Sequence, residues 1–460
     1  MARILTSKRF MIFATIIAGL WASYSFASGE EGHGSSEVSS VLLGLIIILL
    51  AAKIGGDLFE RFKQPAVLGE LILGMIIGNL GLMGIDIFEP FKHSATLEIL
   101  AEIGVIILLF EVGLESTIGE MMKVGVVSFM VASFGVIAPF FLGWGVGAWF
   151  LPEESIYVHV FIGATLTATS VGITARVLQD IGRSNTKEAK IILGAAVIDD
   201  IMGLVILAIV AGIIGAAAGG GGLSSGSVFM IVIKAVGFVI GALLIGNLLS
   251  PIFFRVGSHM RVKGILLSIA LLTCFVFAYL ADMIGLAPIV GAFAAGLILE
   301  KVHYSEYNAW AGDSLEEMIK PIAIFLVPIF FVRMGMMVQL DTFVQMDILF
   351  FAGTMTVAAI IGKQACSLAI FDRRINRIAI GLGMIPRGEV GLIFAGIGAK
   401  LFLDGHPIIS GGTFSAIVIM VIVTTLVTPP FLKLSLLRKD SSTITESNIE
   451  PKEGQRKETN

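Results

Sequence analysis

The sequence predicts an all-α integral membrane protein with about thirteen transmembrane helices. Hydrophobic residues make up 56% of the 460 residues and charged residues only 14%, and the mean hydropathy is +0.95. These values exclude an ordinary soluble globular protein. Apolar stretches long enough to cross a hydrocarbon layer of about 30 Å recur between short polar loops. The predicted spans are 38–59, 65–85, 96–114, 122–150, 157–178, 189–215, 227–250, 263–283, 285–302, 320–339, 346–371, 377–402 and 411–434.

The charged residues of the loops predict the orientation of these spans. Lys and Arg gather in alternate loops, for example at Arg255 and Arg261, whereas the opposite loops hold acids such as Glu153 and Glu154. Basic loops face the cytoplasm in membrane proteins. We therefore expect a multi-pass protein whose C-terminus is cytoplasmic.

Both ends of the chain differ in composition from the spans. Three basic residues precede a short apolar stretch, 10–22, and small residues follow it. This pattern is typical of a signal peptide, predicted over 1–27, with an additional membrane helix as the alternative. Residues 438–460 are polar without apolar periodicity, which predicts a disordered cytoplasmic tail.

The adjacent acids Asp199 and Asp200 in AAVIDDIMGL indicate a cation site inside the membrane. They follow the start of their span at Ala189 by about ten residues, which at about 1.5 Å per residue places them near mid-membrane. Each charge there costs about 2.5 to 3.5 kcal/mol, so burial for packing alone is disfavoured. Adjacent carboxylates repel each other, so sodium ions and protons should compete for them.

Two interrupted segments predict inverted repeats with two crossed discontinuous helices. In GATLTATSVGITARVL, hydroxyl residues that include Thr169 and Ser170 cluster between glycines, and Pro386 interrupts RIAIGLGMIPRGEVGL. Hydroxyl and freed carbonyl oxygens suit a hard cation. The alternative for the hydroxyl groups is hydrogen bonding between packed helices.

Further charges lie within other spans. Lys363, in TVAAIIGKQ, can pair with one of the acids or, alternatively, extend its side chain to the cytoplasmic edge. Arg387, Glu389, Arg333 and Glu70 are predicted to be supporting intramembrane charges, because internal ion pairs explain them as well as contacts with a transported ion do.

The segments TATSVGITARV, AAVIDDIMGL, IIGKQ and PRGEVGL resemble the NapA-type sodium/proton antiporters of the cation:proton antiporter superfamily, in the monovalent cation:proton antiporter 2 branch. The resemblance covers the chain after residue 38. It implies that Asp200 is the main sodium ligand and proton carrier, that Asp199 is a second carrier paired with Lys363, and that Thr169 is a nearby ligand. It further implies an electrogenic transporter of the inner membrane that exports Na⁺ in exchange for H⁺, with Li⁺ as a second candidate cargo.

The same resemblance implies a homodimer surrounded by lipid, with no cofactor, no enzymatic activity and no nucleic-acid partner. Within a transmembrane domain over 38–434, it implies that a core bundle slides like an elevator against a dimerisation bundle. The implied core bundle is 96–215 and 346–434, the dimerisation bundle 38–85 and 263–339, and the linker helix 227–250.

Two other functions are weighed against this one. A potassium/proton antiporter or potassium efflux system of the same superfamily would share the same helices. An intramembrane aspartyl protease would need two carboxylates that face each other. Consecutive residues on a helix diverge by about 100°, so Asp199 and Asp200 cannot form such a pair.

Overall fold

The computed structural model describes residues 37–62, 64–85, 88–115, 125–183, 186–218, 229–238, 240–242, 244, 264–299, 315–372 and 374–447. Within these ranges the protein is helical, apart from loops and a pair of two-residue antiparallel strands, β1 (Phe402–Leu403) and β2 (His406–Pro407). The predicted all-α fold class is confirmed. The predicted signal peptide, 1–27, lies outside the described residues.

Seven helices of the described chain are long and apolar enough to cross a membrane, which identifies a multi-pass membrane protein. A bent pair, α17 (Arg377–Gly383) and α18 (Gly388–Lys400), with 46° between its two halves, can form an eighth span. The seven helices are α2 (Glu37–Arg61), α7 (Gly125–Phe150), α10 (Lys187–Ala218), α12 (Ile265–Met283), α15 (Leu315–Met336), α16 (Met346–Gln364) and α19 (Gly411–Ser447).

The other predicted spans hold helices that are shorter or, in α5, richer in acidic residues. They are α3 (Ala66–Gly78), α5 (Ala95–Glu115), α8 (Ile156–Thr165), α9 (Val171–Asp180) and α13 (Pro288–Ile298), with α4 (Glu89–Lys92) and the 3₁₀ turns η1 (Leu80–Met83), η3 (Leu340–Val344) and η4 (Ala365–Ala369) between spans or at their ends. Residues 229–238 and 240–242 are also helical. Each predicted span therefore contains helix, and the count of thirteen stays a prediction.

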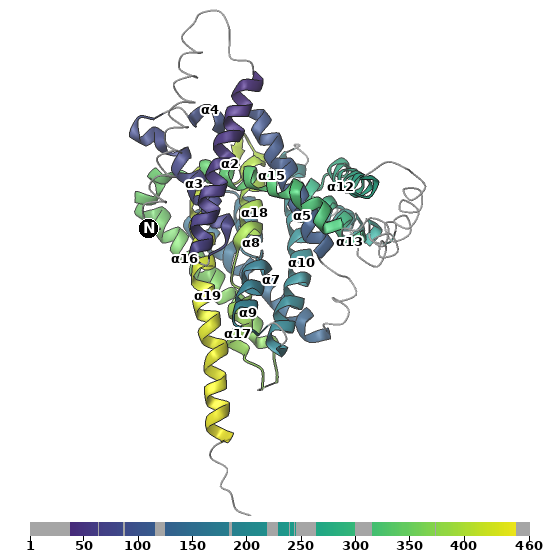
Figure 1. Ribbon diagram of the computed structural model, residues 1–460, viewed down its shortest axis with the longest axis vertical. Coiled ribbons are helices and arrows are strands. Elements are labelled where there is room, and N and C mark those ends of the chain that lie inside the picture. The colour runs from purple at the N-terminus through teal and green to yellow at the C-terminus, as the bar shows by residue number, and fades with distance from the viewer. Residues whose placement is uncertain are drawn as a thin grey trace, which may run out of the picture.

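The contacts between helices divide them into two groups, whose members overlap in the view of Figure 1. In the first group, α5 packs against α13 and α15, and α3 packs against α2 and α15. In the second group, α7 packs against α8, α10 and α16. Helix α19 packs against α16 and also against α9, α17 and α18. We call these the α5 group and the α7 group.

One helix lies in a different group from the one predicted. The core bundle was predicted to begin at residue 96, but α5 packs with the helices predicted for the dimerisation bundle. Glycines explain the close packing, because a Cβ atom added at Gly113 would overlap the Phe293 carbonyl of α13, and one added at Gly104 would approach the Leu326 carbonyl of α15. The boundary between the two groups therefore falls after Glu115.

The C-terminal segment also differs from its prediction. Helix α19 continues to Ser447, so the first part of the segment predicted to be disordered from residue 438 is helical. Adding residues to a helix that has already formed costs little, which explains why polar residues can continue it. In Figure 1, α19 is the long yellow helix that extends beyond the others at the lower end.

Candidate functional site

The two interrupted helices of the α7 group cross each other at their breaks. Helices α8 and α9 are separated by 166–170, and α17 and α18 by 384–387. The Ser170 N–H donates to the Pro386 carbonyl over 2.7 Å, and the Thr174 hydroxyl donates to the Gly383 carbonyl over 2.6 Å. Proline cannot donate a backbone hydrogen bond and disfavours helix in the residue before it, which explains the second break. The predicted crossing of two discontinuous helices is confirmed.

A fully buried ion pair joins α10 to α16 beside this crossing. Lys363 Nζ lies 2.8 Å from Asp199 Oδ1, and both side chains are 0% exposed. The alternative in which Lys363 extends to the cytoplasmic edge is therefore wrong. Asp199 Oδ2 is buried without a hydrogen-bond partner among the described residues. A buried polar atom without a partner is costly, so this oxygen is available to a water molecule or a cation.

Helix α7 covers this ion pair with a glycine, which the sequence analysis did not identify. A Cβ atom at Gly135 would lie 3.5 Å from both Asp199 Oδ1 and Lys363 Nζ, and only 2.8 Å from the Sγ atom of Cys366. A side chain at this position would displace the Cys366 thiol. The glycine lies four residues before Pro139 of the same helix, but nothing local in the sequence identifies the pair that it contacts.

Asp200 has a different environment from Asp199, although it is the next residue. Asp200 is half-buried, and it interacts electrostatically with Asp199, Glu389 and Lys363. No cluster of three or more His, Cys, Asp or Glu side chains that could hold a metal ion occurs among the described residues. A monovalent cation at Asp200 would therefore also need hydroxyl or carbonyl oxygens, which hard cations accept readily.

The helix breaks place such oxygens at the crossing. The Thr169 hydroxyl donates to the Met384 carbonyl over 3.5 Å, and the Ser170 hydroxyl donates to Glu389 Oε2 over 2.8 Å. Both Thr169 and Ser170 are 1% exposed. The structure thus brings the predicted hydroxyl residues together with the second broken helix.

Arg387 contacts backbone carbonyls of neighbouring segments. The guanidinium, which is 0% exposed, donates from Nη1 to the Ala168 carbonyl and from Nη2 to the Ala359 carbonyl over 3.4 Å. These bonds connect the first helix break to α16. Among the described residues, the hydrogen bonds of Arg387 go to carbonyl groups and not to Glu389, and its role as a supporting charge stays a prediction.

The transmembrane sodium/hydrogen exchanger family matches residues 45–437 of the chain. The chain belongs to this family. It is 37% identical over 458 residues to the high-affinity Na⁺/H⁺ antiporter NhaS3 of a Synechocystis species, covering 92% of this chain and 96% of the relative. It is also 37% identical to the Na⁺/H⁺-K⁺ antiporter GerN of Bacillus cereus, covering 86% and 97% of the two chains.

The fold of the exchanger resembles that of a solved antiporter. The sodium proton antiporter MjNhaP1 of Methanocaldococcus jannaschii matches with a TM-score of 0.67 and 18% identity, over 87% of this chain and 99% of that chain. The predicted resemblance to sodium/proton antiporters is thus confirmed. Transport of ions, not enzymatic catalysis, is the activity of this family.

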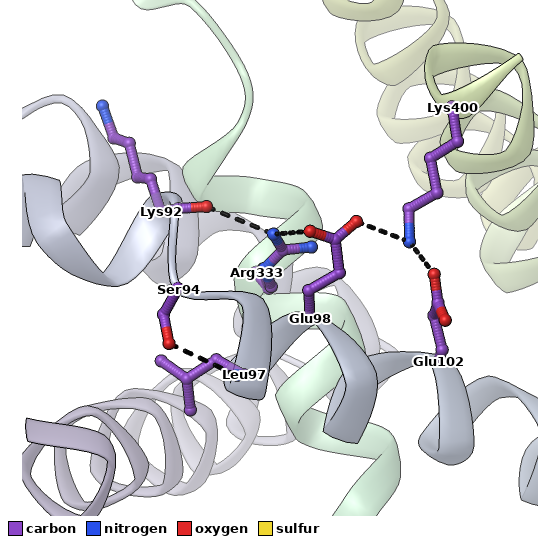
Figure 2. Close-up of polar contacts among 7 residues, drawn as sticks. All are labelled: Lys92, Ser94, Leu97, Glu98, Glu102, Arg333 and Lys400. Carbon is purple, nitrogen blue, oxygen red and sulfur yellow. Dashed lines mark hydrogen bonds and ion pairs between the residues drawn. The ribbon is translucent and has the colours of Figure 1, made fainter. Parts of the chain in front are cut away.

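Arg333 of the exchanger belongs to a second group of charges, which Figure 2 shows. Its Nη2 atom lies 3.1 Å from Glu98 Oε2 and donates to the Lys92 carbonyl over 3.2 Å. On the other side of Glu98, Lys400 Nζ lies 2.9 Å from Oε1 and also pairs with Glu102. We call Arg333, Glu98, Lys400 and Glu102 the helix-end cluster, because they lie near the ends of α15, α5 and α18. Arg333 thus connects α15 to Glu98 and to the Lys92 carbonyl, and its role as a supporting intramembrane charge stays a prediction.

Two acids of the α5 group also have their positions settled. The Glu102 side chain is 51% exposed and pairs with Lys400. Glu70 on α3 is buried and interacts electrostatically with Lys53 of α2, and its role as a supporting intramembrane charge stays a prediction. Its helix packs against α2 and α15, which makes it a charge of the α5 group.

Proposed function

We propose that the exchanger is an electrogenic antiporter that exports Na⁺ from the cell in exchange for H⁺ across the inner membrane. The observation that supports this most is the contrast between neighbouring acids: Asp199 is buried against Lys363, and Asp200 is partly exposed beside the crossing. The names of NhaS3 and GerN support Na⁺ and H⁺ as the exchanged ions.

Competition between Na⁺ and H⁺ at one site produces the exchange. An Asp200 carboxylate that binds Na⁺ must first release its proton, so it crosses the membrane with one ion or the other. Hydroxyl and carbonyl oxygens at Thr169 and Ser170 complete the shell of the metal ion. Because the protein alternates between the two sides with a single kind of site, the proton gradient drives Na⁺ out.

The Lys363–Asp199 pair supplies a second titrating group. A cation that approaches Asp199 Oδ2 weakens the electrostatic attraction between the Asp199 carboxylate and the Lys363 ammonium. The buried ammonium then loses its proton more readily. Two protons are thereby exchanged for one Na⁺, so the cycle moves net charge. Either Asp199 or Lys363 carries the second proton.

The α7 group, which holds the crossing, moves against the α5 group in an elevator-like cycle. We propose that the α5 group provides the surface for a homodimer and that the C-terminus lies in the cytoplasm. The two groups are packed within themselves, and breaks in the helices at the crossing leave a site that can face either side.

The test uses the full-length exchanger in proteoliposomes. A Na⁺ jump across an imposed proton gradient should produce proton movement inside the vesicles and a transient electrical current on a solid-supported membrane. Asp200→Asn, which cannot bind a proton or hold a negative charge, should abolish both signals. Asp347→Asn, at an exposed acid in the first turn of α16, is the matched control and should behave like the wild type.

Two results would contradict this proposal. Unchanged transport in Asp200→Asn would show that Asp200 is not the ion-binding residue. Proton movement without current would show electroneutral exchange.

Potassium is an alternative cargo, because the name of GerN includes K⁺. Jumps of Na⁺, Li⁺ and K⁺ at equal concentration distinguish the two readings. A Na⁺ response well above the K⁺ response supports sodium export, and equal responses support a mixed Na⁺/K⁺ antiporter.

A further inference from the structure

Glu389, in the first turn of α18, makes a contact that the exchange mechanism above leaves unused. We propose that Glu389 is a positioning residue that orients the Ser170 hydroxyl as a ligand for a small monovalent cation at Asp200. This inference rests on the proposed function, because it assigns a role to Glu389 at the same site. It concerns the affinity for the metal ion and not the presence of exchange.

The hydrogen bond from Ser170 to Glu389 determines whether the Ser170 hydroxyl can donate to or accept from a further partner. Ser170 Oγ donates to Glu389 Oε2 over 2.8 Å. A serine hydroxyl has one hydrogen and two acceptor lone pairs. Because its hydrogen is used toward Glu389, Ser170 presents only acceptors to any other partner. An oxygen held in this way suits a metal ion and is a poor donor to a competing carbonyl.

The backbone on both sides restricts the position of this hydroxyl. The Ser170 N–H is held by the Pro386 carbonyl at 2.7 Å, and Gly388 approaches from α18 with a φ angle of 39°. A Cβ atom at Gly388 would lie only 2.5 Å from Ser170 Oγ. Glycine is therefore required at this position for two reasons, its backbone angle and the contact with Ser170. The Ser170 side chain has little room to adopt another rotamer.

The negative charge of Glu389 acts in the same direction. Glu389 interacts electrostatically with Asp200, and Arg387, two residues away, uses its guanidinium for carbonyl groups of other segments. A charged acceptor strengthens the bond from the hydroxyl and leaves more electron density on the serine oxygen. The cation at Asp200 then meets an oriented and polarised oxygen from the opposite helix break.

A double-mutant cycle on the full-length exchanger in proteoliposomes tests this role. Glu389→Ala should raise the KM for Na⁺ about tenfold with little change in the maximal rate, because one hydrogen bond to a charged group is lost. In a Ser170→Ala background, the same change should alter KM less than about twofold, because the oriented group is already missing. Glu389→Gln should recover part of the lost affinity, since its amide oxygen can still accept from the hydroxyl but carries no negative charge.

The controls separate this role from a loss of folding or of exchange. Glu60→Ala alters an exposed glutamate, and Ser133→Ala alters a half-buried serine whose hydroxyl donates to the Phe129 carbonyl of its own helix; both should leave KM unchanged. If Glu389→Ala does not fold, Glu389→Met has similar length and no oxygen acceptor, and carries the same expectation. Thermal unfolding of each variant checks its integrity.

Two results would overturn the inference. The first is an unchanged KM in Glu389→Ala, and the second is an equal effect of this change with and without Ser170. A wild-type protein without Na⁺-driven proton movement would instead contradict the proposed function itself, so the two failures are distinguishable.

Discussion

Two groups of charges in this exchanger both connect helices far apart in the sequence, but they differ in their exposure to solvent. In the Lys363–Asp199 pair, both side chains are 0% exposed. In the helix-end cluster, Arg333 is 6% exposed and Glu98 37%, and Lys400 is 38% exposed. The first pair joins helices within the α7 group, and the second cluster joins the α5 group to α18.

The difference teaches which ion pair is retained for transport and which for packing. Burying two charges costs more than their attraction commonly returns, so a fully buried pair is weak support for stability by itself. A partly exposed pair costs little and contributes little. The burial of the Lys363–Asp199 pair therefore agrees with the role in ion exchange proposed above, and the helix-end cluster connects the ends of three helices.

The largest effect is expected from breaking the buried pair on one side only. Lys363→Met should lower the free energy of unfolding by about 3 to 5 kcal/mol, because Asp199 then remains buried without its partner. The double variant Lys363→Met with Asp199→Asn should regain most of this loss. Thermal unfolding in detergent measures the stability of both variants. Equal stabilities of the single and the double variant would contradict the claim that an unpaired Asp199 carboxylate destabilises the fold.

An intermediate effect is expected at Arg333, which is buried but bonded to a partly exposed acid. Arg333→Met should lower the free energy of unfolding by about 1 to 3 kcal/mol, since Glu98 keeps Lys400 as a partner. Arg61→Met alters an exposed arginine and is the matched control. A loss as large as that of Lys363→Met would show that the two regions do not differ as their exposure suggests.

The smallest effect is expected at Lys400. Lys400→Gln should cost about 0.2 to 1 kcal/mol, and high salt should reduce the difference from the wild type further. Lys433→Gln, at an exposed lysine of α19, provides the comparison. A loss in the free energy of unfolding that does not change with salt would show that Lys400 is more buried than its exposed fraction of 38% indicates.

Several site residues could be predicted before the fold was known. A charged side chain within an apolar span is unfavourable in lipid, and this can be recognised from the neighbouring residues alone. Asp199, Asp200 and Lys363 interrupt apolar spans, and charge in lipid is expensive wherever the helix packs. Pro386 and the hydroxyl cluster around Thr169 likewise interrupt helix by their own chemistry. These local signals led to the two helix breaks and to the acids beside them.

Other features could not be predicted, because they depend on partners distant in the sequence. The hydrogen bond between Ser170 and Glu389 joins residues 219 positions apart, and Glu98 was not recognised as the partner of Arg333. The grouping of α5 with α13 and α15 depends on glycines that meet carbonyls of other helices. Glycine spacing alone does not specify which helix approaches.

The sequence by itself determined that this chain is a multi-pass membrane protein with acids, a lysine and two interrupted helices inside the bilayer. Composition and local helix chemistry are sufficient for these features, since a long apolar stretch indicates a span and a charge within it is unfavourable before any packing is known. Only the tertiary structure decided that Lys363 is wholly buried on Asp199, that Asp200 remains partly accessible, and that Glu389 accepts from Ser170. Those distinctions arise from the packing of helices from opposite parts of the chain, where differences of a few ångströms decide which oxygen is paired and which is left for an ion.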